Sequence, residues 1–145
     1  MALTQSNGNL DQALALLRQK GLSQAGKKAD RATDEGTIYA YIHSGGKIGV
    51  LIEVNCETDF VSRNDEFQTF VREIALHIAG SVPPPQYVRK DEAPPDLVPK
   101  DTCLMEMPFI KNPSVTIGDM VTEKIAKMGE NITIRRFTRY QLGGA

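Results

Sequence analysis

The stretch TIYAYIHSGGKIGVLIEVNC, residues 37–56, decides how the rest of the chain must fold. In its first half the side chains alternate, with Ile38, Ala40 and Ile42 on one side and Thr37, Tyr39, Tyr41 and His43 on the other. In its second half every second residue is apolar or a cysteine: Ile48, Val50, Ile52, Val54 and Cys56. A period of two is typical of half-buried strands. The Gly45-Gly46 turn between the two runs predicts an antiparallel β-hairpin.

A helix is expected soon after the hairpin. Asn64 can cap its first turn, and the acidic Asp65 and Glu66 suit the positive end of the helix dipole. Apolar residues then follow at helical spacing: Phe67, Phe70, Val71, Ile74 and Ile78. We expect this helix to end at Gly80 and to cover the apolar face of the hairpin.

Residues 83–102 carry six of the eight prolines, which predicts a linker without a packed element of its own. Residues 103–110 have an extended pattern. Thr116 can cap a second helix that ends at Gly129, with one apolar face formed by Ile117, Met120, Val121, Ile125 and Met128.

The last strand is expected over residues 130–142. Ile132 and Ile134 share one face of this strand, but Phe137 falls out of phase with them. A β-bulge near Arg135-Arg136 would bring Phe137 back to the same face.

Residues 9–35 read as helical, whereas residues 1–8 show no periodicity. Asn9 to Lys20 predicts one short helix, with Leu10, Ala13, Leu14 and Leu17 on one face and Gly21 at its end. Residues 23–33 predict a second, weaker helix or a basic linker. One short amphipathic helix cannot bury its apolar stripe alone, so this segment must dock on something or be part of a larger bundle.

The order of elements predicts an α+β fold. Three strands in the order β-β-α-β and two covering helices make a two-layer domain over residues 36–145. Residues 1–35 then form a separate helical segment with a linker.

Composition limits the function. The 145 residues have a net charge of −1, so no overall field draws the chain to nucleic acid or to an anionic membrane. The longest apolar run, residues 48–52, is far shorter than a membrane helix needs, and no secretory signal opens the chain. Cys56 and Cys103 match no metal-ligand spacing, and we expect no metal or cofactor. A reducing cytosol is the expected location.

Several residues invite a catalytic interpretation that the pattern does not support. Gly21-x-x-x-x-Gly26-Lys27 imitates the start of a phosphate-binding loop, but Lys28 stands where Ser or Thr is needed, and a helix precedes it. Cys56 continues the inward face of its strand, and nothing places His43 beside it. His77 flanks the apolar stripe of its helix and is expected to be half-buried. We therefore expect no enzyme.

Arg135, Arg136 and Arg139 form a basic strand together with the aromatic residues Phe137 and Tyr140. Such a strand can bind RNA phosphates and stack bases. A ribosome- or RNA-associated protein is therefore the alternative function, although the chain lacks the net basic charge typical of this class.

Residues 55–64, NCETDFVSRN, are the most informative for function. Phe60 lies in a polar turn between the strand and the capped helix. It either folds back onto the core or stays exposed to anchor a partner, and exposed aromatic residues are typical interface hot spots. Asp59 beside it offers a charge that can act on groups around a bound cation.

The chain resembles elongation factor Ts, the exchange factor for the translational GTPase EF-Tu. The resemblance rests on ALALLRQKGLSQAGKK (residues 13–28), VNCETDFVSRN (54–64), residues 104–113 and IAKMGENITIRRFTRY (125–140). TDFV at 58–61 and GENI at 129–132 are the most specific parts.

The resemblance implies a partner, a site and a fold. In this family the aspartate and phenylalanine of the TDFV stretch push between helices of EF-Tu and displace Mg²⁺ from GDP. The matching residues here are Asp59 and Phe60, flanked by Thr58 and Val61. The family's core (dimerisation-type) domain, a three-stranded antiparallel sheet with helices on one face, corresponds to residues 36–145. Residues 1–35 correspond to a partial UBA-like segment in which only the third helix remains. EF-Tu is thus the implied partner, and neither a membrane nor direct nucleic-acid binding is expected.

Overall fold

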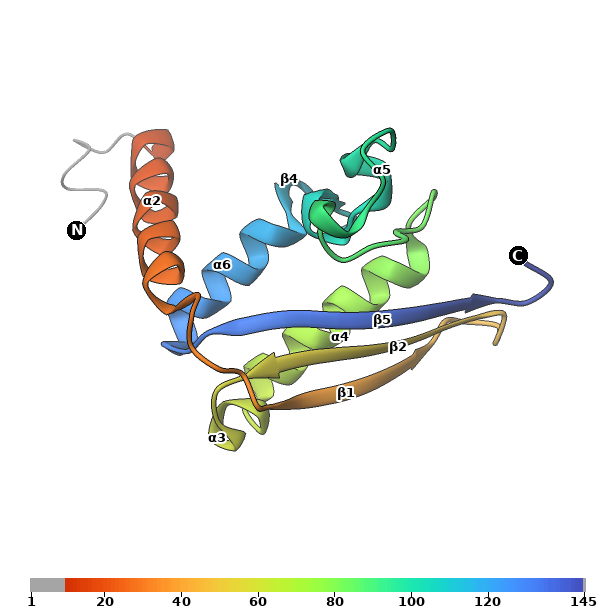
Figure 1. Cartoon of the computed structure of the whole chain (residues 1–145), viewed down its shortest axis with the longest axis horizontal. Helices are drawn as coiled ribbons and strands as arrows, with labels where there is room; N and C mark the ends of the chain where they lie inside the picture. Colours follow the sequence, from red (N-terminus) through yellow and green to blue (C-terminus); the bar gives the residue numbers. More distant parts are fainter. Residues whose placement is uncertain (1–9, 145) are drawn as a thin grey trace.

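The structure, a computed structural model, describes residues 10–144 and, within them, all side chains except those of residues 10–14, 17 and 18. The elements in chain order are α2 Leu10–Lys28, β1 Glu35–Ile42, β2 Ile48–Cys56, α3 Asp59–Ser62, α4 Asp65–Gly80, η1 Lys90–Glu92, α5 Pro99–Thr102, η2 Leu104–Glu106, β3 Pro108–Phe109, β4 Asn112–Thr116, α6 Ile117–Met128 and β5 Ile132–Gln141. Figure 1 shows one layer of strands with helices α4 and α6 behind it. The predicted α+β fold is confirmed.

The main sheet has three antiparallel strands in the order β1-β2-β5. The hairpin predicted from residues 37–56 is confirmed, and the last strand pairs with its second arm. The register between β2 and β5 shifts between Glu53 and Val54, whose partners are Arg136 and Ile134, so Arg135 is the extra residue. The predicted bulge is therefore present, and it lets Phe137 pack against the same core as Ile134.

The inner face of β1 carries tyrosines, whereas its isoleucines face outward. Tyr39 lies opposite Ile52 and Tyr41 opposite Val50, and both tyrosines pack against the core. Ile38 and Ile42 are 64% and 67% exposed. Because directly opposed residues of paired strands share a face, the fully apolar pattern of β2 decides which side of β1 is buried.

Helices α4 and α6 begin and end where the sequence predicts. The Asn64 side chain accepts a 2.8 Å hydrogen bond from the Glu66 N–H at the start of α4. Thr116 caps α6 and forms a capping box with Asp119. Gly129 ends α6 in the left-handed conformation, with φ 74°. The apolar stripes of both helices lie in the common core.

The prediction of a helix end at Gly21 was wrong, because α2 continues to Lys28 as one helix. Gly21 is buried, and a Cβ placed on it would lie 3.8 Å from Thr122 Cγ2 on α6. Tertiary packing on α6 thus outweighs the helix-breaking tendency of glycine. The expected cap Asn9, and the side chains of the expected stripe Leu10, Ala13, Leu14 and Leu17, lie outside the described residues. In the described part of the chain, no helix has the length and apolarity that a membrane crossing requires.

The proline-rich segment is more ordered than predicted. Val88 joins the core, and Tyr87 forms a bridge with Cys103. The short helices η1 and α5 lie within residues 83–102, and β3 and β4 form a second, two-stranded sheet after them. The prediction of a linker without packed elements was therefore wrong, since Val88 of this segment packs in the core.

Candidate functional site

The turn between β2 and α4 contains a four-residue helix, α3, that projects at one end of the sheet (Figure 1). Thr58 caps it, since its hydroxyl oxygen accepts a hydrogen bond of 3.4 Å from the Val61 N–H. Val61 is only 5% exposed and packs in the core. The cap and this apolar anchor together fix how the turn is oriented.

Phe60 points away from the protein. Its side chain is 81% exposed, although the adjacent Val61 is buried. It lines a shallow hollow of about 380 Å³ with Asp59, Arg63 and Asn64. Of the two possibilities that the sequence left open for Phe60, the structure therefore shows the exposed one. An aromatic ring held in water can gain substantial free energy when a partner covers it.

Asp59 is also exposed, and within the described residues its one ion pair is with Arg63, at 3.5 Å. Both side chains are largely in solvent, at 62% and 81% exposure. Exposed ion pairs of this kind contribute about 0–1 kcal/mol. The Asp59 carboxylate can therefore exchange this contact for one with a partner at little cost.

The GENI stretch lies directly against the TDFV stretch. The chain turns at Gly129, and the Glu130 carboxylate accepts a 2.6 Å hydrogen bond from the Thr58 hydroxyl. The two stretches thus meet in the fold although 72 residues separate Thr58 from Glu130. Sequence reasoning assigned Glu130 no role beyond its place in a family signature, because no local pattern connects it to Thr58.

The sequence matches the family model described as "Elongation factor TS" over residues 24–102 and 57–145. The chain is also 45% identical to an elongation factor Ts of Carboxydothermus hydrogenoformans over 98% of its own length and 79% of that protein. The chain belongs to the elongation factor Ts family.

Two further members of the elongation factor Ts family show the same likeness. The proteins of Alkaliphilus oremlandii and Geobacter sulfurreducens are 46% and 45% identical, again over 98% of this chain and 79% and 80% of theirs. Membership makes the chain a translation elongation factor. These alignments span 174 positions, more than the 145 residues of this chain, so the relatives carry insertions relative to it.

In this member of the elongation factor Ts family, Cys56 is unsuited to nucleophilic chemistry. The thiol is completely buried. Burial, and to a lesser degree the negative charge of Glu130, raise its pKa to about 11, so the reactive thiolate is scarce at neutral pH. Glu35 pairs with Cys56 at one end of the hairpin, whereas His43 follows β1 at the other end. The structure does not bring Cys56 and His43 together.

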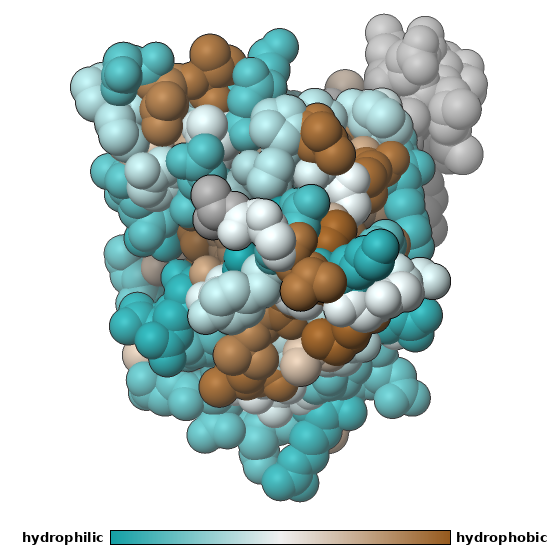
Figure 2. Space-filling model, turned by 90° about the vertical axis from the view of Figure 1, so that its right-hand side faces the viewer, coloured by the Kyte–Doolittle hydropathy of each residue, from teal (hydrophilic) through white to brown (hydrophobic). Residues whose placement is uncertain are grey.

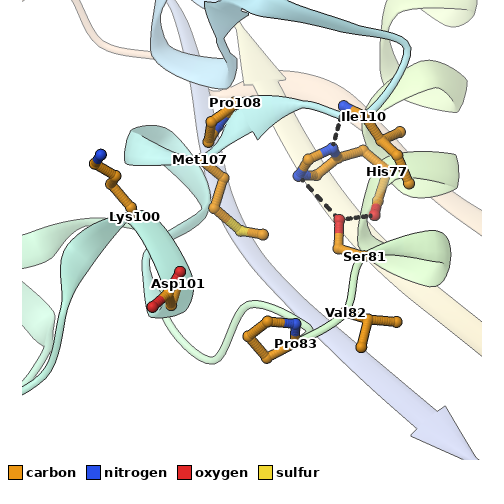
Figure 3. A pocket seen from close by; sticks show the side chains of 9 residues that line it. All are labelled: His77, Ser81, Val82, Pro83, Lys100, Asp101, Met107, Pro108 and Ile110. Atoms are coloured by element: carbon orange, nitrogen blue, oxygen red, sulfur yellow. Dashed lines mark hydrogen bonds between the residues drawn. The ribbon is translucent and has the colours of Figure 1, made fainter.

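His77 is fully buried, at 1% exposure, so the expectation of a half-buried flank was wrong. The reason is that the β3–β4 hairpin covers this end of α4. The Ile110 N–H donates a hydrogen bond of 3.1 Å to His77 Nδ1, as Figure 3 shows. Burial lowers the pKa of His77 to about 4, so the ring is neutral at pH 7.

The His77 and Ser81 pair in Figure 3 does not form a catalytic dyad. Because Nδ1 accepts a hydrogen bond, the neutral ring carries its proton on Nε2, which lies 3.3 Å from Ser81 Oγ. The Ser81 hydroxyl donates to the His77 carbonyl at 2.6 Å. A serine nucleophile needs an unprotonated Nε2 that accepts the proton of its hydroxyl. Here Nε2 carries a proton and the Ser81 hydroxyl donates elsewhere.

Apolar surface gathers at one end of the molecule. Figure 2 views the end with the β1–β2 turn and the C-terminus, and it shows hydrophobic residues surrounded by hydrophilic ones. The hollow of about 300 Å³ beside His77 is lined in part by the exposed Val82 and Ile110.

Two arginines of the basic strand bond to other parts of the protein. Arg136 pairs with Glu53 at 2.8 Å across the sheet, and this contact lowers the pKa of the Glu53 carboxyl. Arg139 donates to the carbonyl oxygens of Ile78 and Ala79 at 3.1 and 3.2 Å, which satisfies the end of α4. Of the three arginines, two thus have structural partners, which weakens the RNA-binding alternative.

Proposed function

We propose that this chain is a guanine-nucleotide exchange factor that binds EF-Tu·GDP, displaces Mg²⁺ and promotes GDP release, without covalent chemistry. The single observation that carries the proposal is the exposed ring of Phe60 beside the exposed carboxylate of Asp59. Family membership supports EF-Tu as the partner and the bacterial cytoplasm, or an organelle, as the place of action.

The physical basis is thermodynamic linkage. A partner that binds the empty GTPase more tightly than the GDP-bound form must weaken GDP binding by the same factor. Loss of Mg²⁺ removes the largest positive charge near the phosphates and leaves their negative charge uncompensated. A ring that enters beside the cation site and a carboxylate that competes there act in the same direction.

The magnitude shows how much Phe60 can contribute. Burying a phenylalanine side chain contributes about 1.5–3 kcal/mol, and about 1.4 kcal/mol corresponds to a factor of ten. Because Phe60 is 81% exposed, nearly all of this gain remains available for binding. Phe60 therefore supplies roughly a ten- to hundredfold effect, and the rest of the affinity comes from other surfaces.

Release of labelled GDP from EF-Tu tests the proposal directly. The rate is measured with the unmutated chain, with Phe60→Ala and with Tyr140→Ala. Tyr140 is a matched control because it is an aromatic residue of similar exposure, 76%, that pairs with Gly49 at the far end of the sheet from α3.

We expect the unmutated chain and Tyr140→Ala to accelerate release, and Phe60→Ala to lose roughly nine-tenths or more of the gain. Folding is checked by urea unfolding, where an exposed side chain should change stability by no more than about 0.5 kcal/mol. No acceleration by the unmutated chain at saturating concentration would refute the proposal. Equal losses in both variants would show that Phe60 has no special role.

A further inference from the structure

Glu130, which follows the end of α6, accepts three hydrogen bonds from the residues that precede α3. Its Oε1 accepts hydrogen bonds from the Glu57 N–H at 3.1 Å and the Thr58 N–H at 3.0 Å. Its Oε2 accepts the Thr58 hydroxyl at 2.6 Å. We infer that Glu130 is a positioning residue that sets the direction of Phe60. This inference rests on the proposed exchange function and adds to it a residue outside the TDFV stretch.

The short bond to Thr58 controls the cap of α3. A threonine hydroxyl has one hydrogen and two lone pairs. Because the hydrogen points to Glu130, a lone pair is left to face the Val61 N–H, which lies 3.4 Å from the oxygen. Glu130 therefore fixes the rotation of the hydroxyl as well as the backbone before it.

A second carboxylate, that of Glu57, connects the same two segments in the opposite direction. Glu57 Oε2 accepts a 2.6 Å hydrogen bond from the Asn131 N–H. The Asn131 side chain in turn donates to the carbonyl oxygens of Ala29 and Arg31, at 3.4 and 2.9 Å. The end of α6, the start of α3 and the segment after α2 are thus parts of one network, and charged acceptors make its bonds stronger than neutral ones.

Helix α3 needs such support because it has only four residues. A helix of that length is not stable by its own backbone hydrogen bonds. With Val61 in the core and Glu130 on Thr58, the backbone on both sides of Phe60 is held, which fixes the direction in which its side chain leaves the chain. A turn whose backbone is already ordered loses less conformational entropy when a partner covers its exposed ring.

The inference is tested by Glu130→Ala and Glu130→Gln in two measurements. The first is the maximal rate of GDP release from EF-Tu, in the natural sequence and in a Phe60→Ala background. The second is hydrogen exchange of the Thr58 and Val61 amides in the isolated chain. Glu92→Ala is the matched control, because the Glu92 carboxylate also accepts a backbone N–H, that of Arg89 at 2.8 Å, but in η1.

Glu130→Ala removes three hydrogen bonds to a charged group. We expect it to lower the maximal rate roughly tenfold or more, since the loss of one such bond alone corresponds to about a factor of ten. In the Phe60→Ala background the same change should have no further effect, because Glu130 acts through Phe60. Glu130→Gln should lose less, since its carbonyl oxygen can still accept the two backbone N–H groups. The Thr58 and Val61 amides should exchange about tenfold faster in Glu130→Ala, and Glu92→Ala should change neither measurement.

Equal fold losses with and without Phe60 would overturn the inference, because Glu130 would then act independently of the ring. Unchanged exchange of the Thr58 and Val61 amides would overturn it as well. If the unmutated chain does not accelerate GDP release, the proposed function fails, and the amide measurement alone still decides whether Glu130 orders α3. If Glu130→Ala unfolds the chain, Glu130→Gln provides the same comparisons.

Discussion

Mild acid should destabilise this protein mainly through His77. The ring is buried, its Nδ1 accepts the Ile110 N–H, and it packs near the Phe109 ring, with 6.0 Å between ring centroids. Protonation would place a second N–H against that donor and a positive charge in an apolar site. The charged groups at the hollow's edge, Lys100 and Asp101, are both exposed and carry opposite charges.

The magnitude follows from the two pKa values. His77 titrates near 6.5 in the unfolded chain and near 4 in the folded one. Because the folded pKa is lowered, the unfolded state binds more protons between these values. The stability is therefore fully present above pH 6.5 and is lost as the pH falls towards 4. Between pH 7 and pH 5 the free energy of unfolding should fall by about 2 kcal/mol.

Urea unfolding at pH 7 and at pH 5 measures this loss, in the natural sequence and in His77→Gln. The glutamine carbonyl oxygen can still accept the Ile110 N–H, but the side chain does not titrate. We expect the variant to be less stable at pH 7 and to lose about 2 kcal/mol less on acidification. Acidic residues with lowered pKa values, such as Glu53 and Glu66, contribute equally to both proteins. The same loss in both proteins would refute the reasoning.

Two pairs of substitutions test the backbone geometry of the fold. Gly36→Ala should destabilise the fold by about 2 kcal/mol more than Gly45→Ala. Both glycines have positive φ, 147° and 92°, but of the two only Gly36 lies where a new Cβ would overlap the Val54 carbonyl oxygen. Comparison of their thermal unfolding checks this, and equal effects would contradict the close approach of β1 to β2 at Gly36. Thr116→Ala should lower the free energy of unfolding by about 1 kcal/mol, because it removes the hydroxyl that accepts the Asp119 N–H at 3.0 Å. Thr116→Ser, which keeps the hydroxyl, should retain most of this stability. An alanine variant as stable as the natural sequence would show that the cap contributes nothing.

Features that depend on near neighbours in the chain were predictable. The period of two in residues 48–56, the caps Asn64 and Thr116 and the end of α6 at Gly129 each depend on contacts within a few residues. The bulge near Arg135 was visible because Phe137 is out of phase with Ile134. The position of Phe60 in a polar turn was also visible, although not the direction of its ring.

Features that depend on distant partners were decided only by the tertiary structure. The buried face of β1 follows from its pairing with β2, and the continuation of α2 through Gly21 follows from packing on α6. His77 is buried because the hairpin at Ile110, 33 residues away, covers it. The Thr58 hydroxyl meets Glu130 across 72 residues. Caps and periodicity are short-range properties of the sequence, whereas burial and long-range hydrogen bonds exist only after the layers have packed, and this packing leaves Phe60 in the solvent.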